Sequence, residues 1–114
     1  ENIYPELIES VINNQDFVTE SLVIPEQGGL AALIKIDVEA FASKMALNVN
    51  EAKDEALKYV AKIREDVNKE LSAFSRLSSA ELQEEPFQRT PTQKIKRFLY
   101  SRGKDDTAKG AEKG

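Results

Sequence analysis

The sequence predicts an α+β domain, in which a small antiparallel β-sheet of about three strands carries one long helix and one or two shorter helices. Three observations predict this class. Two apolar, β-branched runs flank a Gly-rich turn, as in a β-hairpin. After Asn50, apolar residues recur at helical spacing over more than five turns. The chain has 114 residues, of which 40% are hydrophobic, and this is enough for one modest core.

The first predicted element is a helix over residues 5–14. Pro5 suits the first helical position, because the amide proton that it lacks would have no partner there. Glu6 and Glu9 fall in the first turns, where the helix dipole favours acidic side chains. The apolar residues with helical spacing are Leu7, Ile8, Val11 and Ile12.

The two apolar runs, residues 17–25 and 30–36, predict the strands of an antiparallel hairpin. Gln27, Gly28 and Gly29 between them have the composition of a tight turn. The two glycines lack the surrounding frame of a phosphate-binding loop, so we interpret them as turn residues only.

Two more helices are expected to follow. Asp37 is predicted to cap a short one, and Asn50 a long one that ends at about Phe74. The short helix would pack through Phe41, Ala42, Met45 and Ala46. The stripe of the long helix consists of Leu57, Val60, Ile63, Val67, Leu71 and Phe74. Its outer face carries the (i, i+4) pairs Asp54–Lys58, Lys62–Asp66 and Glu65–Lys69, which indicate a solvated surface.

The rest of the chain is less regular. Residues 77–84 alternate weakly and predict a third strand, followed by a loop bounded by Pro86 and Pro91. A closing helix or turn is expected around residues 95–100, and a disordered tail over residues 102–114.

Composition excludes several kinds of chemistry. The chain has no cysteine and no histidine, so disulfides, thiolate zinc sites, cysteine nucleophiles and Ser-His-Asp catalysis are excluded within it. No metal site is predicted, and no apolar run approaches the roughly 18 residues that span a bilayer. The net charge of -4 is unevenly distributed. Residues 1–85 hold 17 acidic and 8 basic residues, whereas residues 86–104 hold six basic residues and no acidic one.

Residues 87–98, FQRTPTQKIKRF, are the most unusual stretch. A lysine on such a loop is a mobile point charge that can reach a phosphate or a carboxylate and stabilise charge during attack on a phosphoryl group. The alternative is a solvated basic end that balances an acidic body. The opening, residues 1–6, is likewise either a ligand-contacting loop or a helix start whose acids serve the dipole.

Two segments together resemble a known family. Residues 1–9, ENIYPELIE, are similar to the hinge-proximal motif G-E-N-I-x-P-x-E-I-E of AMP-forming adenylating enzymes. Residues 90–97, TPTQKIKR, resemble the terminal lysine motif of that family, P-x-T-x-[GX]-K-I-x-R. The resemblance covers residues 1 to about 101 and is to the small C-terminal domain. Many members have Gly before the lysine, and Gln93 at that position resembles the long-chain fatty-acid–CoA ligases.

The resemblance implies that residues 1–101 are the mobile C-terminal lid of an acid–thiol ligase that uses ATP with Mg²⁺ and coenzyme A. The large N-terminal adenylation domain, expected in the same polypeptide, lies outside this chain, so the isolated chain should be inactive. Lys94 is implied as the catalytic residue of adenylation, with Thr92 and Arg97 as nucleotide or phosphate contacts. After a rotation of the lid, Asn2, Ile3 and Tyr4 would line the path of the CoA pantetheine.

Two alternatives stay open. One is the lid of a fatty acyl-AMP ligase that loads a carrier protein instead of CoA. The other is a stand-alone module whose basic end binds an anionic partner such as nucleic acid or lipid headgroups, with salt-sensitive affinity. The main interpretation expects fatty acid, ATP and CoA as partners, no nucleic acid, and a cytoplasmic enzyme for which peripheral membrane association stays open.

Overall fold

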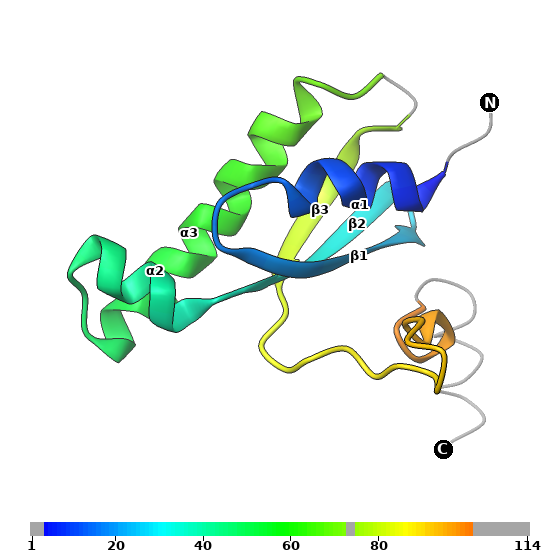
Figure 1. Ribbon diagram of the computed structural model, residues 1–114. Helices are drawn as coiled ribbons and strands as arrows, with labels where there is room; N and C mark the ends of the chain where they lie inside the picture. The colour runs from blue at the N-terminus through cyan, green and yellow to red at the C-terminus, as the bar shows by residue number, and fades with distance from the viewer. Residues whose placement is uncertain (1–3, 73–74, 102–114) are drawn as a thin grey trace, which may run out of the picture.

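The computed structural model describes residues 4–72 and 75–101 (Figure 1). The predicted tail, residues 102–114, lies outside this part of the chain. In chain order the elements are α1 (Pro5–Asn13), β1 (Val18–Glu26), β2 (Gly29–Ile36), α2 (Val38–Met45), α3 (Val49–Asn68), β3 (Leu77–Leu82) and the short 3-10 helix η2 (Arg97–Leu99).

The strand order is β1-β2-β3, and the predicted hairpin forms its antiparallel part. Glu26 pairs with Gly29, so Gln27 and Gly28 are the two connecting residues. Strand β3 runs parallel to β2, with Leu77 beside Leu30. The α+β class and the three strands are confirmed, but the sheet is mixed and not antiparallel throughout. The reason is the α2–α3 crossover, which returns the chain to the end of the sheet where β2 began.

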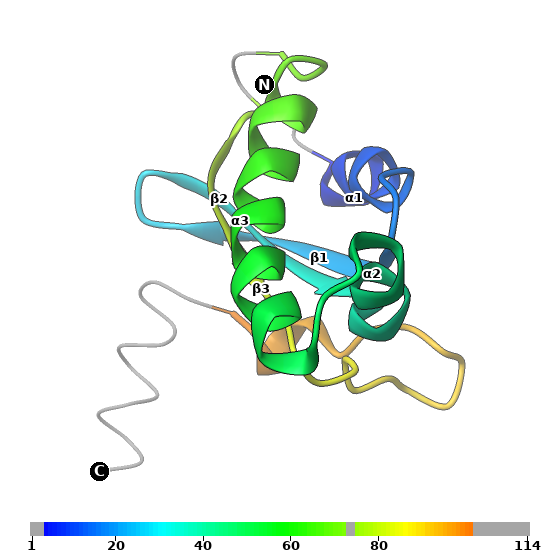
Figure 2. The ribbon, with the colours of Figure 1, turned by 90° about the vertical axis from the view of Figure 1, so that its left-hand side faces the viewer.

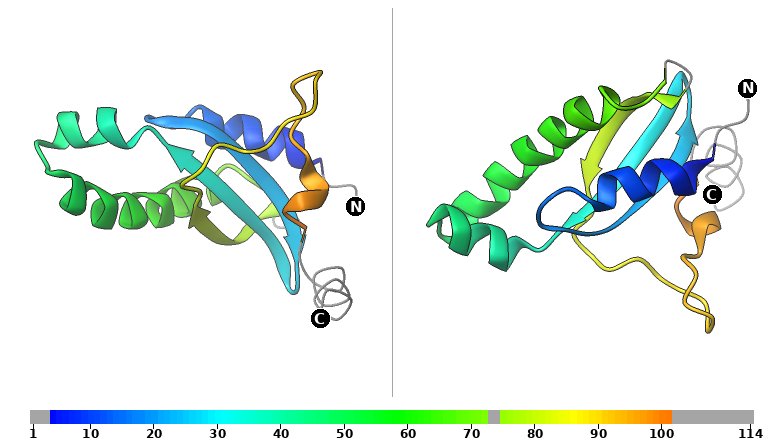
Figure 3. Two further views of the ribbon diagram at one scale, coloured as in Figure 1. Left: turned by 90° about the horizontal axis from the view of Figure 1, so that it is seen from below. Right: turned by 45° about the horizontal axis from the view of Figure 1, so that its top comes forward.

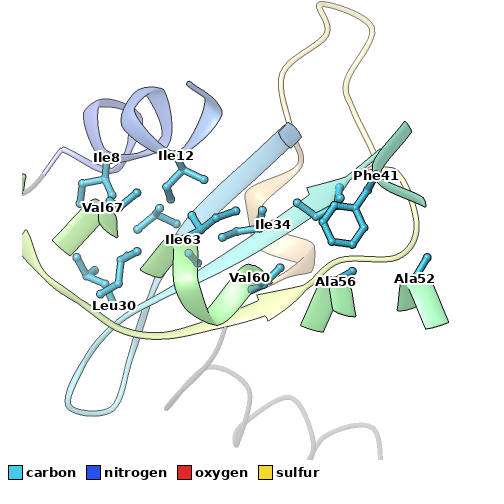
Figure 4. Close-up of a cluster of buried hydrophobic side chains, with 14 residues drawn as sticks. Ile8, Ile12, Leu30, Ile34, Phe41, Ala52, Ala56, Val60, Ile63 and Val67 are labelled. Carbon is cyan, nitrogen blue, oxygen red and sulfur yellow. The ribbon is translucent and has the colours of Figure 1, made fainter. Parts of the chain in front are cut away.

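Helices α1 and α3 lie on one face of the sheet, and α2 packs beside α3 beyond the end of β2, with Phe41 reaching the same core (Figures 1 and 2). Alternate residues of β2 point to this side, as the pleat of a strand requires. They meet the apolar sides of α1 and α3 in the main core, which Figure 4 shows. Its fully buried members are Ile12, Val23, Ala32, Ile34, Ile36, Ala52, Ala56, Val60, Ile63 and Val67.

The opposite face of the sheet is covered by residues 83–101, called the terminal segment below, which Figure 3 shows from below. The intervening residues of the hairpin, among them Leu22 and Leu33, form a second cluster around Phe87. Tyr100 packs against it, and its ring meets that of Phe87 edge-on with centroids 5.1 Å apart. The terminal segment is therefore part of the folded body, because it buries the outer face of the hairpin.

Helix α3 begins and ends earlier than the sequence predicts. Its cap is Asn48 and not Asn50: the Asn48 side chain accepts from the Glu51 amide at 2.8 Å, and Glu51 accepts from the Asn48 amide at 2.9 Å. The helix ends at Asn68, well before residue 74. The Asn68 side-chain amide instead binds both backbone groups of Leu77, at 2.8 and 3.1 Å, and so aligns the start of β3.

The core stripe of α3 also differs from the prediction. Ala52 and Ala56 are fully buried, whereas Leu57 is 55% exposed. Val60, Ile63 and Val67 are in the core as predicted. Small side chains at the start of α3 let that end of the helix lie close to its neighbours, so Leu57 is turned toward solvent.

The outer face of α3 carries one of the three predicted pairs, with Lys62 bound to Asp66 at 2.9 Å. Lys58 is paired with Glu55 at 3.3 Å, and Lys69 approaches Asp66 at 3.6 Å. These exposed pairs contribute little to stability.

Tyr59 gives the fold a dependence on alkaline pH. Its hydroxyl donates to the Asp16 carbonyl oxygen at 2.7 Å. Burial, and then the nearby Asp16 carboxylate, raise the pKa of Tyr59 above its usual 10.0. The unfolded chain therefore loses this proton first, so the contribution of Tyr59 is complete below about pH 10 and is lost as pH rises further. We expect urea unfolding to show a shallower loss of stability above pH 10 in Tyr59→Phe than in the wild type. Equal slopes would contradict this.

Candidate functional site

Residues 88–96 form a small two-stranded hairpin, called the lysine hairpin below. It projects from the sheet (Figure 3). Arg89 and Ile95 form an antiparallel bridge, and the Lys96 amide donates to the Gln88 carbonyl oxygen at 2.9 Å. The Thr90 amide donates to the Lys94 carbonyl oxygen at 2.8 Å, which places Lys94 beside the tip.

The tip is a turn over Thr90-Pro91-Thr92-Gln93, closed by the Gln93 amide donating to the Thr90 carbonyl oxygen at 2.8 Å. Pro91 takes the second turn position, where its fixed φ is suitable. The Thr90 hydroxyl oxygen lies 3.0 Å from that of Thr92 and 3.2 Å from the Lys94 amide that donates to it. The turn thus holds the backbone of Lys94 and leaves its side chain exposed.

Gln93, which directly precedes Lys94, has a backbone conformation that favours glycine. Its φ is 70°, in the left-handed region that costs a side chain about 1–2 kcal/mol. We expect Gln93→Gly to raise the free energy of unfolding by about 0.5–1 kcal/mol, since part of this gain is offset by the entropy of glycine in the unfolded chain. Gln93→Val should lower it. Urea unfolding of both variants checks the conformation, and a destabilised Gln93→Gly would contradict it.

Lys94 is an unpaired cation within the described part of the chain. No carboxylate of residues 4–72 and 75–101 forms an ion pair with it. Thr92, two residues earlier, is exposed on the same tip. The structure therefore brings these two predicted residues together at a place that another domain or a ligand can reach.

Arg97 is held by the fold. Its Nη2 donates to Oε1 of Glu9 at 2.9 Å, and its Nη1 lies 3.4 Å from the Val23 carbonyl oxygen. The second Glu9 oxygen accepts from the Val23 amide at 2.8 Å. The pair thus binds both outward-facing backbone groups of Val23 on β1, and it fastens η2 to α1 and β1. Among the predicted phosphate contacts, Arg97 already has these partners, whereas Thr92 stands at the open tip.

The opening segment is described only in part. Asn2 and Ile3 lie outside the described residues. Tyr4 is 55% exposed, and its carbonyl oxygen accepts from the Leu7 amide at 2.9 Å as α1 begins. Glu6 lies 3.7 Å from Arg97, so the start of α1 and the end of the terminal segment meet at one end of the molecule.

Two features of the described residues bear on other kinds of function. They contain no group of three acidic side chains placed to hold a metal ion. Over the same residues, no helix is long and apolar enough to cross a membrane.

The fold is that of a small domain found in acyl-CoA synthetases and ligases. The sequence matches no protein-family model and no curated protein. The structure matches the fatty acyl CoA synthetase of Mycobacterium tuberculosis with a TM-score of 0.59 and 24% identity over 88% of this chain. It matches the acyl-CoA synthetase of Brucella canis with a TM-score of 0.61 and 21% identity over 96%.

A third match is the ATP-bound crystal structure of MatB from Rhodopseudomonas palustris, with a TM-score of 0.62 and 19% identity over 88% of this chain. This chain spans only 17–18% of the length of the three matched proteins. At these identities the matches establish a shared fold, and they show that the fold occurs as one part of a much longer enzyme.

Proposed function

We propose that this chain is the C-terminal lid domain of an AMP-forming fatty-acid–CoA ligase and that Lys94 serves its adenylation step. The observation that carries the proposal is the position of Lys94: an exposed, unpaired cation beside the tip of an ordered hairpin, within the described part of a fold shared with acyl-CoA synthetases. The two motifs at residues 1–9 and 90–97 support the same assignment.

In the first step a carboxylate oxygen of the fatty acid attacks the α-phosphorus of MgATP. A bond forms between them, the bond to the bridging oxygen breaks, and pyrophosphate leaves. Both reactants are anionic, so a cation that reaches between the carboxylate and the phosphate oxygens aligns them and stabilises the transition state. Lys94 is suited to this role because its ammonium group is a point charge on a flexible stem.

In the second step the thiol of CoA attacks the acyl carbonyl carbon, and AMP leaves. The lid would present a different surface for this step, formed by the opening segment around Tyr4. A rigid-body rotation can exchange two surfaces only if the domain itself keeps its shape. The ion pair between Glu9 and Arg97 supports this, because it ties the start of the chain to the segment that carries Lys94.

The test is exchange of labelled pyrophosphate into ATP by the full-length protein, with long-chain and short-chain fatty acids compared. We expect exchange that depends on the long-chain acid, and none from the 114-residue chain alone. Product analysis with CoA or with an acyl carrier protein then identifies the acceptor of the acyl group.

Three results would contradict the proposal. The first is a full-length protein that exchanges with no carboxylic acid. The second is turnover of ATP by the isolated chain, which would refute its role as a lid. The third is salt-sensitive binding of polyanions by the isolated chain together with no exchange, which would favour an anion-binding module.

A further inference from the structure

Arg89 connects the lysine hairpin to the sheet. Its Nη2 donates to Oε1 of Glu20 on β1 at 2.6 Å, and its Nη1 donates to the Gln93 carbonyl oxygen at 2.8 Å. One guanidinium therefore joins β1 to the peptide bond that immediately precedes Lys94. Its planar shape and fixed donor directions suit it to hold two acceptors in a defined geometry.

Glu20, the carboxylate that binds Arg89, is itself held in place. The Glu20 side chain is only 16% exposed, and its second oxygen accepts from the Phe87 amide at 3.2 Å. Phe87 is buried in the second cluster, which lies on the outer face of the sheet and is called the outer cluster below. A continuous series of contacts thus runs from the outer cluster through Glu20 and Arg89 to the tip of the lysine hairpin.

The connection through Arg89 is the polar contact that reaches the tip from the sheet. The hydrogen bonds described for residues 90–94 join them to one another and to Arg89. They fix the shape of the turn. Ile95 packs against the cluster around Phe87 and holds the base of the hairpin on the sheet, and the Arg89–Glu20 pair adds a polar connection from the sheet to the tip. Gln93 is in the left-handed conformation, so the hold on its carbonyl oxygen also sets the direction in which the chain enters Lys94.

We propose that Arg89 is a positioning residue for Lys94, which holds the tip so that Lys94 reaches the reacting groups of the first step. This inference rests on the proposed function. A displacement of about 1 Å in a catalytic group can cost about 100-fold in rate. Loss of Arg89 should therefore slow adenylation and spare the second step, in which Lys94 takes no part.

The experiment uses the full-length protein with Arg89→Ala, Arg89→Lys and the control Lys96→Ala. Lys96 lies on the same hairpin, and no described carboxylate pairs with it, so its loss removes an equal charge without the connection. The measurements are kcat and KM for ATP in adenylation, the rate of thioester formation from supplied acyl-adenylate, and the thermal midpoint.

We expect Arg89→Ala to lower the kcat of adenylation about 10- to 100-fold, with a smaller change in KM and an unchanged thioester rate. Arg89→Lys should fall between Arg89→Ala and the wild type, because an ammonium lacks the two-pronged geometry. Lys96→Ala should stay near the wild-type rates. Because Arg89 acts through Lys94, the double variant Arg89→Ala/Lys94→Ala should be no slower than Lys94→Ala alone.

Several outcomes would overturn the inference. Equal losses in both half-reactions would mean that Arg89 serves only to keep the protein folded. An Arg89→Ala rate equal to the wild type, or a double variant slower than Lys94→Ala, would show that Arg89 does not act through Lys94. These outcomes leave the proposed function intact as long as the wild-type protein exchanges labelled pyrophosphate into ATP. A wild-type protein without this exchange would refute the proposed function itself.

Discussion

Lys94→Ala in the full-length protein is expected to slow formation of the acyl-adenylate by about 100-fold or more. Removal of a single donor to a developing anion in an active site commonly costs this much. Lys94 offers such a charge at an exposed tip, and no carboxylate of the described residues neutralises it. Thioester formation from supplied acyl-adenylate should continue at nearly the wild-type rate, because the proposed mechanism uses the other surface of the domain in that step.

Single-turnover measurement of each half-reaction checks this expectation. Lys96→Ala is the matched control, because it removes a neighbouring positive charge from the same hairpin. If the two variants lost adenylation equally, the general positive charge of the segment would be responsible, and not Lys94. A loss of both half-reactions in Lys94→Ala would refute a role restricted to the first step.

The second large effect is expected in the core. Ile63→Ala in the 114-residue chain should lower the free energy of unfolding by about 2–5 kcal/mol, because it leaves a cavity between α3 and the sheet. Ile63 is completely buried, with Ile12, Ile34 and Val67 in the same cluster. Urea unfolding followed by circular dichroism measures the change.

Leu57→Ala provides the control for that measurement. Leu57 lies on the same helix but is 55% exposed, so its truncation should change stability by no more than about 0.5 kcal/mol. A large effect at Leu57 and a small one at Ile63 would mean that α3 presents a different face to the sheet.

Local signals in the sequence determined most of the fold. Pro5 marks the start of α1, and the Asp37 side chain accepts from the Ala40 amide at 3.0 Å as the predicted cap of α2. The error at α3 was also local, because Glu51 three residues after Asn48 already has the spacing of a capping box. The parallel pairing of β3 has no such signal, since it follows from how the crossover packs.

The candidate site also has a part that the sequence predicts and a part that it does not. The turn before Lys94 can be anticipated from Thr90-Pro91-Thr92, because proline fixes the backbone there. The partners that hold the hairpin could not be anticipated. Glu20 is 69 residues from Arg89 and Glu9 is 88 residues from Arg97, and no spacing rule connects acids and arginines at such separations. Only the folded sheet brings them into contact.

The terminal segment both carries Lys94 and covers part of the sheet, and this restricts which mutations the domain can tolerate. Val23 on the outer edge of β1 has its backbone groups bound by Glu9 and Arg97, so they are not available to a strand from another molecule. A chain shortened before Pro86 would lose Lys94 and would also uncover this edge and the apolar face around Leu22. With the proposed role of Lys94, activity and resistance to aggregation depend on the same segment, and mutations that truncate it are expected to remove both together.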